Sequence, residues 1–477
     1  MSREYETVIG LEVHVELATK TKIFCGCSTA FGGAPNTHTC PVCTGMPGSL
    51  PVLNKQVVEY AMAVGLATNC TINQNCKFDR KNYFYPDNPQ NYQISQLYEP
   101  ICRNGSVEIE TADGTKKAIG IHEIHMEEDA GKLVHDDWDD VSIVDFNRSG
   151  VPLIEIVSEP DMRSAEEVIA YLEKLRLIIQ YLGASDCKLN EGSMRADVNL
   201  SVREVGAAEF GTRTEMKNLN SFRAIARAIE GEKNRQIDLI ESGEKVVQET
   251  RRWDDAKESS HAMRSKEDAQ DYRYFPEPDL VPIHISDEWL EEVRSRQPEL
   301  RTEKLARYES EYEIPRYDAE IITASKHLAD IFEQTVAICG KPKKVSNWLM
   351  VETMRLLKER EMEPEDIVFS PEHLAALVEL ADAGTVNSTV AKEVFEQMFA
   401  DDIDPKQYVE EHGLKTVNDE GALRQTIEQV IKDNPQSVDD YHNGKEKAIG
   451  FLVGQTMKVM KGKANPGMVN QILKELL

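Results

Sequence analysis

The sequence predicts an α+β protein in which an antiparallel-sheet domain precedes an all-α helical domain and a small all-α tail domain. Up to about residue 285, apolar and polar residues alternate in short stretches separated by Gly and Asn, as in antiparallel strands. After the cluster Pro276, Pro278 and Pro282 the apolar residues recur with the helical period. The length of 477 residues suits several domains. We expect these domains at 1–293, 294–406 and 407–477.

The first predicted strand covers Ile9 to Leu17. Its odd positions are apolar, and its even positions present Glu12, His14 and Glu16. Alternate side chains of a strand point to opposite faces of the sheet, so one face is apolar and the other polar. A histidine between two glutamates can hold a hard divalent cation. A solvated outer face would show the same pattern, and the two interpretations stay open at this point.

Four cysteines follow as two short pairs, Cys25 with Cys27 and Cys40 with Cys43, each on a turn that contains Gly or Pro. This spacing predicts a closed structural zinc site of four thiolates, which stabilises rather than catalyses. The alternative is four unrelated free thiols. The remaining cysteines lack such spacing and are predicted to be buried as small apolar residues: Cys70, Cys76, Cys102, Cys187 and Cys339.

Further polar faces are predicted in three segments of the sheet domain: His125 to Asp129, Ala196 to Val202, and Arg213 to Lys217. Each alone is typical of a surface. Together they predict a sheet face that holds divalent cations through carboxylates and phosphate through Lys or Arg, as phosphoryl transfer requires. The sequence has no GxxxxGK[ST] loop and no GxGxxG after a strand, so a nucleotide site would be built on the sheet.

Helices are predicted wherever capping and stop signals flank a 3.6-residue period. In the first domain, Ser164 to Gly183 combines a capping-box pattern with one apolar stripe, which indicates a structural core helix. In the remainder the predicted helices are Ser370 to Gly384, Thr385 to Phe399, Glu420 to Lys432, Lys445 to Met460 and Met468 to Leu477.

The charge distribution restricts the partners. A formal net charge of −28 disfavours a protein that coats nucleic acid nonspecifically, so contact with nucleic acid must be local. One basic patch lies between residues 443 and 477, where six lysines outnumber the two acidic residues, Glu446 and Glu475, and give a local charge of +4. The six are Lys445, Lys447, Lys458, Lys461, Lys463 and Lys474.

Targeting and redox signals favour the cytoplasm. No apolar run approaches the roughly 18 to 20 uncharged residues that span a bilayer, because Gln455 and Lys458 interrupt the best candidate. The first ten residues pass into a strand pattern without a charged leader or an apolar export segment. The nine cysteines disfavour a disulfide scaffold, because their number is odd and they are unevenly spaced along the sequence. We expect no membrane role.

Several long motifs carry a family resemblance. They are YETVIGLEVHVEL (5–17), FDRKNYFYPD (78–87), HMEEDAGK (125–132), VDFNRSGVPLIEIVSEP (144–160), DYRYFPEP (271–278) and GKEKAIGFLVGQTMKVMKGKANP (444–466). They resemble, in the same order and over essentially the whole chain, the B subunit of the aspartyl/glutamyl-tRNA amidotransferases. Phe146 stands where that family more often has Leu or Met. The four cysteines fit the cysteine-containing branch of the family.

This resemblance implies a cradle domain with a fold similar to that of glutamine synthetase, followed by helical and tail domains that engage tRNA. It implies two reaction steps: ATP phosphorylates the side-chain carboxylate of a misacylated Glu-tRNA(Gln) or Asp-tRNA(Asn), and ammonia then displaces the phosphate. The sequence shows no amidase signature of its own. The resemblance therefore implies a glutaminase A subunit and a small C subunit as partners.

The resemblance also assigns roles to residues. Catalysis and Mg²⁺ binding fall to Glu12, His14, Glu127, Asp197 and Glu215, with Asp197 as a catalytic residue rather than a magnesium ligand. Phosphate contact falls to Lys81 and Lys217, and tRNA contact to Lys445, Lys447, Lys458, Lys461 and Lys463. The implied cofactors are ATP, Mg²⁺ and Zn²⁺. Two other functions remain to be weighed: a noncatalytic tRNA-binding scaffold, and a free-standing ligase that makes a small amide from ammonia.

Overall fold

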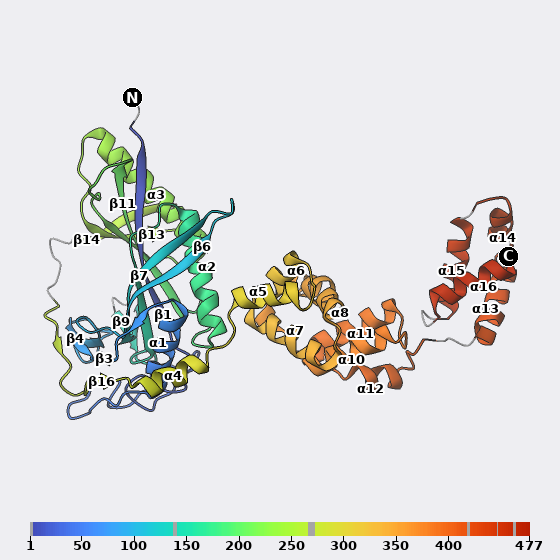
Figure 1. Cartoon of the computed structure of the whole chain (residues 1–477), viewed down its shortest axis with the longest axis horizontal. Coiled ribbons are helices and arrows are strands. Elements are labelled where there is room, and N and C mark those ends of the chain that lie inside the picture. Colours follow the sequence, from blue (N-terminus) through green and yellow to red (C-terminus); the bar gives the residue numbers. More distant parts are fainter. Residues whose placement is uncertain (1–2, 137–140, 266–271, 417–419, 446, 461–463) are drawn as a thin grey trace. The chain divides into compact units, whose positions relative to one another are not determined.

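The computed structural model describes residues 3–136, 141–265, 272–416, 420–445, 447–460 and 464–477 (Figure 1). Its contacts divide the chain into two compact units, Met1–Leu300 and Arg301–Leu477. The three domains expected from the sequence stay a prediction. None of the described helices is both long and apolar enough to cross a lipid bilayer.

The first unit is built on a mixed but largely antiparallel sheet of nine strands. Among the described strands of this sheet, only β12 and β13 pair in parallel. In spatial order the strands are β14 (Ser259–Ser265), β13 (Glu249–Asp254), β12 (Thr214–Lys217), β11 (Met194–Glu204), β1 (Tyr5–Glu16), β10 (Pro152–Ser158), β7 (Lys116–Glu128), β6 (Cys102–Glu110) and β2 (Thr71–Ile72). The α+β class with an antiparallel sheet is therefore confirmed.

Three helices lie against the sheet: α1 (Lys55–Ala67), α2 (Ala165–Tyr181) and α3 (Phe222–Ser242). Figure 1 shows β1 in the interior of the sheet, with α2 and α3 beside the strands. The odd residues of β1, such as Leu11 and Val13, are buried in the same hydrophobic core as α2 and α3. Hence the apolar face of the sheet is covered by helices, and the even residues of β1 belong to the opposite face.

The helix predicted at Ser164 to Gly183 is confirmed as α2. The Ser164 side chain caps it by accepting a hydrogen bond from the Glu167 backbone N–H. The Glu167 carboxylate accepts from the Arg163 N–H, one residue before the position that a complete capping box would use. Gly183 follows the helix with φ +67°, in the left-handed region that suits glycine.

Smaller sheets complete the first unit. β4 (Asp79–Asn82) pairs with β5 (Tyr92–Ser95) and with β15 (Phe275–Pro276), so two motifs almost 200 residues apart in sequence lie side by side. Hydrogen bonds from Gln93 and Ile94 of β5 to Glu128 attach this sheet to the end of β7. The other pairs are β3 (Asn75–Cys76) with β16 (Ile283–His284), and β8 (Lys132–Asp136) with β9 (Val141–Asp145). The helix α4 (Asp287–Ser295) packs on α1.

A buried carboxylate connects α3 to the sheet and makes stability pH-dependent. Glu232 is 1% exposed and accepts hydrogen bonds from Arg235, Gln236 and Thr214. Burial disfavours the charged form, but these hydrogen bonds and the charge of Arg235 outweigh it and lower the pKa of Glu232. A depressed carboxyl pKa stabilises the folded state above the ordinary Glu pKa, and this stabilisation disappears as the pH falls through the folded-state pKa.

We therefore expect Glu232→Gln to lower the free energy of opening of α3 amides by about 2 to 3 kcal/mol at pH 7. The difference should shrink steadily below about pH 4.5, the ordinary Glu pKa. Hydrogen exchange of α3 in the whole protein measures it. Glu230→Gln is the matched control, because Glu230 is on the same helix and exposed. A Glu232→Gln effect that is equal at pH 7 and pH 3.5 would contradict the assignment.

The second unit is helical. Residues 305–409 share one hydrophobic core and residues 423–473 share another. The first group contains α5 (Arg301–Ser310), α6 (Arg316–Ile322), α7 (Lys326–Cys339), α8 (Pro342–Asn347), the π-helical turn Trp348–Thr353, α9 (Met354–Glu359), the 3₁₀ turn Pro364–Asp366, α10 (Pro371–Asp382), α11 (Ser388–Asp401) and α12 (Pro405–Glu411). The second contains α13 (Glu420–Asp433), α14 (Pro435–His442), α15 (Lys447–Val459) and α16 (Pro466–Leu476).

The helices predicted in this unit are all present, with ends that differ by a few residues. The largest difference concerns α11, which begins at Ser388 and not at Thr385. Asn387 sets this start, because its side chain accepts hydrogen bonds from the N–H groups of Thr389 and Val390. After α11 the chain turns at Asp402, which has φ +46°, before α12 begins.

Candidate active site

The polar face of the nine-stranded sheet collects charged side chains from five neighbouring strands. Residues that are directly opposed in antiparallel strands project on the same face. Glu12 of β1 is opposite Asp197 of β11, and His14 is opposite Glu155 of β10. On β10, Glu155 is in turn opposite His125 of β7. Glu215 of β12 is opposite Asn199 of β11, on the face that carries Asp197. The registers therefore place one continuous polar surface across β12, β11, β1, β10 and β7.

The first carboxylate cluster consists of Glu12, Asp197 and Glu215, each of which offers an oxygen within 4.8 Å of the others. Lys217 contacts both Asp197, at 2.5 Å, and Glu215, at 2.9 Å. Burial, together with the charges of Glu155 and Glu215, raises the pKa of Glu12. One ammonium group among three carboxylates leaves negative charge uncompensated, and hard cations bind to such sets of oxygens.

The second cluster consists of His14, Glu127 and Glu155, again with ligand atoms within 4.8 Å of one another. Glu155 lies 3.3 Å from both His14 Nε2 and His125 Nε2. Glu127 is 3% exposed and accepts a hydrogen bond from the Ser95 hydroxyl at 3.1 Å. A carboxylate between two imidazoles fixes the orientation of both rings.

Electrostatics in the second cluster favour charged forms. Burial disfavours the Glu155 carboxylate, but His125 and His14 outweigh it and hold the pKa of Glu155 well below its usual range. Burial likewise opposes protonation of His14, yet its hydrogen bond with Glu155 and the charges of Glu155 and Glu127 raise the pKa of His14. The pKa of the adjoining His125 is raised as well, because Glu155, Glu123 and Glu127 outweigh its burial, so both imidazoles can be protonated when no metal ion is bound.

Lys81 reaches this face from β4. Burial opposes its charge, but Glu127, Tyr274 and Glu155 outweigh the burial and raise the pKa of Lys81, which stays cationic. Its ammonium lies 5.1 Å from the centre of the Tyr272 ring. Tyr272 packs in turn against Tyr83 and Tyr274. The motifs around residues 78–87 and 271–278 thus form one aromatic wall beside the second cluster.

Sequence reasoning missed several residues of this face. Glu155 is the only charged residue in the strand PLIEIVS and carried no signal beyond its position in a motif. The sequence pattern places His125 and Asp129 in a polar segment but gives neither residue a role of its own. Asp129 is buried and contacts Arg195 at 3.0 Å and Arg148 at 3.5 Å. Burial and the charge of Asp129 raise the pKa of the neighbouring Glu16 to about 8.

The four predicted cysteines, Cys25, Cys27, Cys40 and Cys43, form one cluster with all sulfurs within 4.8 Å of one another. The Sγ atoms of Cys40 and Cys43 are 3.9 Å apart. Four sulfurs at about 2.3 Å around zinc are about 3.8 Å apart at a tetrahedral edge. The pKa of Cys43 is lowered to about 4, chiefly by the hydrogen bond from the Cys25 thiol, which outweighs the effect of burial. A hydrogen bond from the Cys40 backbone N–H and the positive charge of Lys22 lower it further.

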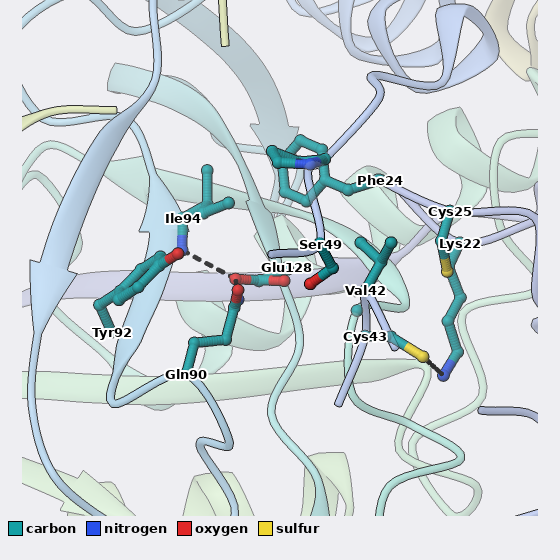
Figure 2. Close-up of a pocket in the computed structure, with 12 residues that line it drawn as sticks. Lys22, Phe24, Cys25, Val42, Cys43, Ser49, Gln90, Tyr92, Ile94 and Glu128 are labelled. Atoms are coloured by element: carbon teal, nitrogen blue, oxygen red, sulfur yellow. Dashed lines mark hydrogen bonds between the residues drawn. The ribbon is translucent and has the colours of Figure 1, made fainter. Parts of the chain in front are cut away.

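A narrow cavity adjoins the cysteine cluster and is drawn in Figure 2. Lys22 and Cys43 line one side, and Gln90, Tyr92, Ile94 and Glu128 line the other. Burial raises the pKa of Glu128 to about 8. Because Glu128 is the last residue of β7, the cavity lies between the thiols and the end of that strand. Of the five other cysteines, Cys70, Cys76, Cys102 and Cys187 are buried as predicted, and Cys339 is half-buried.

The predicted basic patch lies on the last helices. Lys447 and Lys458 are exposed on α15, and Lys474 is exposed on α16. Lys445 is exposed and pairs with Asp440 at 2.9 Å. Lys461 and Lys463 lie outside the described residues.

Comparison with known proteins assigns the chain to a family. Residues 7–291, which contain both carboxylate clusters and the four-cysteine cluster, match the family described as the GatB/GatE catalytic domain. Residues 330–477 match the GatB domain. The nine-stranded sheet therefore belongs to the catalytic domain of an amidotransferase component.

Similar relatives that match over their whole length carry one name, the B subunit of aspartyl/glutamyl-tRNA(Asn/Gln) amidotransferase. The protein of Agathobacter rectalis is 80% identical over 475 residues, and that of Lachnospira eligens is 74% identical over 481 aligned positions, with all of each chain covered. The protein of Caldicellulosiruptor saccharolyticus is 60% identical over 99% of both chains. The chain belongs to the family of amidotransferase B subunits.

Proposed function

We propose that this chain is the subunit that activates and amidates the amino acid on misacylated tRNA, with Glu-tRNA(Gln), Asp-tRNA(Asn) or both as substrates. A carboxylate is a poor electrophile. The γ-phosphoryl group of ATP passes to a side-chain carboxylate oxygen and leaves ADP and an acyl phosphate. Ammonia then attacks the carbonyl carbon, loses a proton, and phosphate departs as the amide forms. The enzyme is thus an ATP-dependent ligase that uses glutamine as its nitrogen donor.

The residues of the polar face divide this work. Glu12 and Glu215 of the first cluster, and His14 and Glu127 of the second, would hold Mg²⁺, with Asp197 and Glu155 beside them. When bound, Mg²⁺ offsets the charge of the phosphate groups during transfer. Lys217, beside the first cluster, and Lys81, beside the second, would offer ammonium groups to the phosphate oxygens. The crowded oxygens of the first cluster, with one lysine to compensate them, suit a hard divalent cation.

The structural metal is proposed to be Zn²⁺. The four thiols supply a complete set of soft ligands, and the separation of 3.9 Å between Cys40 Sγ and Cys43 Sγ suits a tetrahedral edge. A site closed by four sulfurs leaves no position for a water molecule. Cys25, Cys27, Cys40 and Cys43 therefore stabilise the loop before α1 instead of taking part in the reaction.

The proposal includes partners. The B-subunit name of the relatives implies other subunits, and we propose a glutaminase A subunit as the source of ammonia, with a small C subunit bound to both. The lysines of residues 445–463 and the helical second unit would contact the tRNA, and the complex would work in the cytoplasm. We also propose that the cradle formed by the large sheet is related to the glutamine synthetase fold.

One observation carries this proposal: both carboxylate clusters lie on the same face of one sheet, joined by the register of β11, β1 and β10. Phosphoryl transfer needs cation sites that are near one another and near cationic side chains. A tRNA-binding scaffold has no requirement for carboxylates grouped so closely. A ligase for a small amide would use the same face but would not depend on an aminoacylated tRNA.

We expect amide formation on purified Glu-tRNA(Gln) or Asp-tRNA(Asn) when the chain and its partner subunits receive ATP, Mg²⁺ and glutamine. Omission of ATP should stop amide formation without stopping glutamine hydrolysis. The measurement is the amino acid recovered from the tRNA, with ADP counted in parallel. The scaffold alternative predicts no ADP linked to misacylated tRNA. Equal ADP formation with free glutamate in place of the charged tRNA would favour the small-amide ligase.

A further inference from the structure

Lys22 is a buried cation that has no carboxylate partner among the described residues. Its side chain is 0% exposed, yet no carboxylate in the described part of the chain forms an ion pair with its ammonium. Its ammonium instead donates hydrogen bonds to His38 O at 2.7 Å, Phe146 O at 3.2 Å and Cys43 Sγ at 3.5 Å. Figure 2 shows the contact between the Lys22 nitrogen and the Cys43 sulfur. These three acceptors satisfy all three N–H groups of the ammonium.

A buried ammonium requires an opposite charge, since full desolvation of an unpaired ion is prohibitive. The other buried lysine of the described chain follows this rule, because Lys304 pairs with Glu333 at 2.6 Å. Near Lys22 the sulfur of Cys43 is the group that can supply negative charge. Four thiolates around one Zn²⁺ carry a net charge of −2, which Lys22 would reduce to −1.

The same lysine joins the cysteine loop to the turn before β10. Besides the Lys22 contacts, Asn36 N donates to Asp145 Oδ1 at 3.0 Å, and the Ser149 hydroxyl donates to Cys43 O at 3.0 Å. Gly150 lies against Cys43 and Lys22 with φ +80°, where a Cβ atom would be 3.4 Å from Cys43 Cβ. This turn leads directly into β10.

The turn also supports the polar face. Gly150 N donates to Asp129 O at 2.9 Å, and Asp129 N donates to Val151 O at 2.8 Å. Pro152 then begins β10, which carries Glu155 between the two histidines. A displacement of the turn would therefore move the strand that holds the second cluster.

We propose that Lys22 is the counter-charge of the metal-loaded cysteine cluster and that it ties the presence of the metal to the position of the turn at residues 145–151. Lys22 is a positioning residue and does not touch the substrate. The inference rests on the proposal above that the four cysteines hold zinc. It adds a link from that zinc to the reaction face through one side chain.

The test uses the full chain loaded with Zn²⁺ and measures the rate at which a chelator removes the metal. Lys22→Met removes the charge and the donors, Lys22→Gln keeps a donor without the charge, and Lys22→Arg keeps the charge. We expect release at least about tenfold faster for the Met and Gln variants and within about threefold of wild type for Arg. Lys304→Met is the matched control for loss of a buried lysine and should release zinc at the wild-type rate.

Wild-type release from Lys22→Met, or equally fast release from the Arg and Gln variants, would overturn the role of the charge. If Lys22→Met does not fold, the comparison of Gln with Arg decides the same question. A wild-type chain that binds no Zn²⁺ would instead refute the metal proposal itself. Hydrogen exchange tests the coupling: removal of zinc from the wild-type chain should speed exchange in residues 145–151, and unchanged exchange there would refute the link to the turn.

Discussion

Replacing Glu12 with Gln is expected to reduce ATP-dependent amide formation by at least about 100-fold, the size of effect seen when one electrostatic contact to a transition state is removed. Glu12 is the member of the first cluster that lies opposite Asp197 and faces Glu215. Gln has the same shape and can still accept the hydrogen bond that Asn199 donates to Glu12 at 3.0 Å. The loss would therefore come from the missing charge and not from a changed fold.

The same substitution should lower activity without lowering the stability of the metal-free protein. Burial and neighbouring carboxylates raise the pKa of Glu12, so its charge at pH 7 destabilises the folded state when no cation is present. We expect the metal-free Glu12→Gln variant to unfold at the same temperature as wild type or a higher one. Glu4→Gln, an exposed carboxylate one residue before β1, is the control and should change neither property. Near-normal amide formation by Glu12→Gln would remove Glu12 from the cation site.

Alternation along β1 was enough to predict which of its side chains share a face. Glu12 and His14 alternate with buried Leu11, Val13 and Val15, and period-2 patterns of this kind need no knowledge of neighbouring strands. The cysteine cluster was predictable for a similar reason, because short Cys spacings bring sulfurs together locally. Local pattern therefore sufficed for side chains that come together within one strand or one short segment.

Long-range pairing could not be predicted from the same patterns. Glu155 faces the site because β10 lies between β1 and β7 with His14 and His125 opposite it, and no local feature of PLIEIVS encodes that register. Lys22 is one of two lysines in the segment TKTKIF, and nothing in it marks Lys22 as the buried one. Similarly, the parallel pairing of β12 with β13 depends on the crossover through α3.

Glu155 gives the second large effect that we expect. Glu155→Gln should reduce amide formation by about 10- to 100-fold and raise the Mg²⁺ concentration needed for half-maximal rate, because the two imidazoles lose the carboxylate that orients them. Glu155 lies 3.3 Å from His14 and from His125. Steady-state rates of ADP and amide formation at several Mg²⁺ concentrations measure both changes.

A second carboxylate–imidazole pair, Glu159 with His122, provides the control. It distinguishes a specific role of Glu155 from a general effect of losing a carboxylate on this part of the sheet. Glu159 follows β10 and contacts His122 of β7 at 3.0 Å, but both side chains are largely exposed. Glu159→Gln should leave the rate and the Mg²⁺ requirement within about twofold of wild type, because exposed ion pairs contribute little. If the two substitutions had equal effects, the contacts of Glu155 with His14 and His125 would not explain the loss of activity. If Glu155→Gln alone changes the Mg²⁺ requirement, the register of β1, β10 and β7 determines where the cation binds.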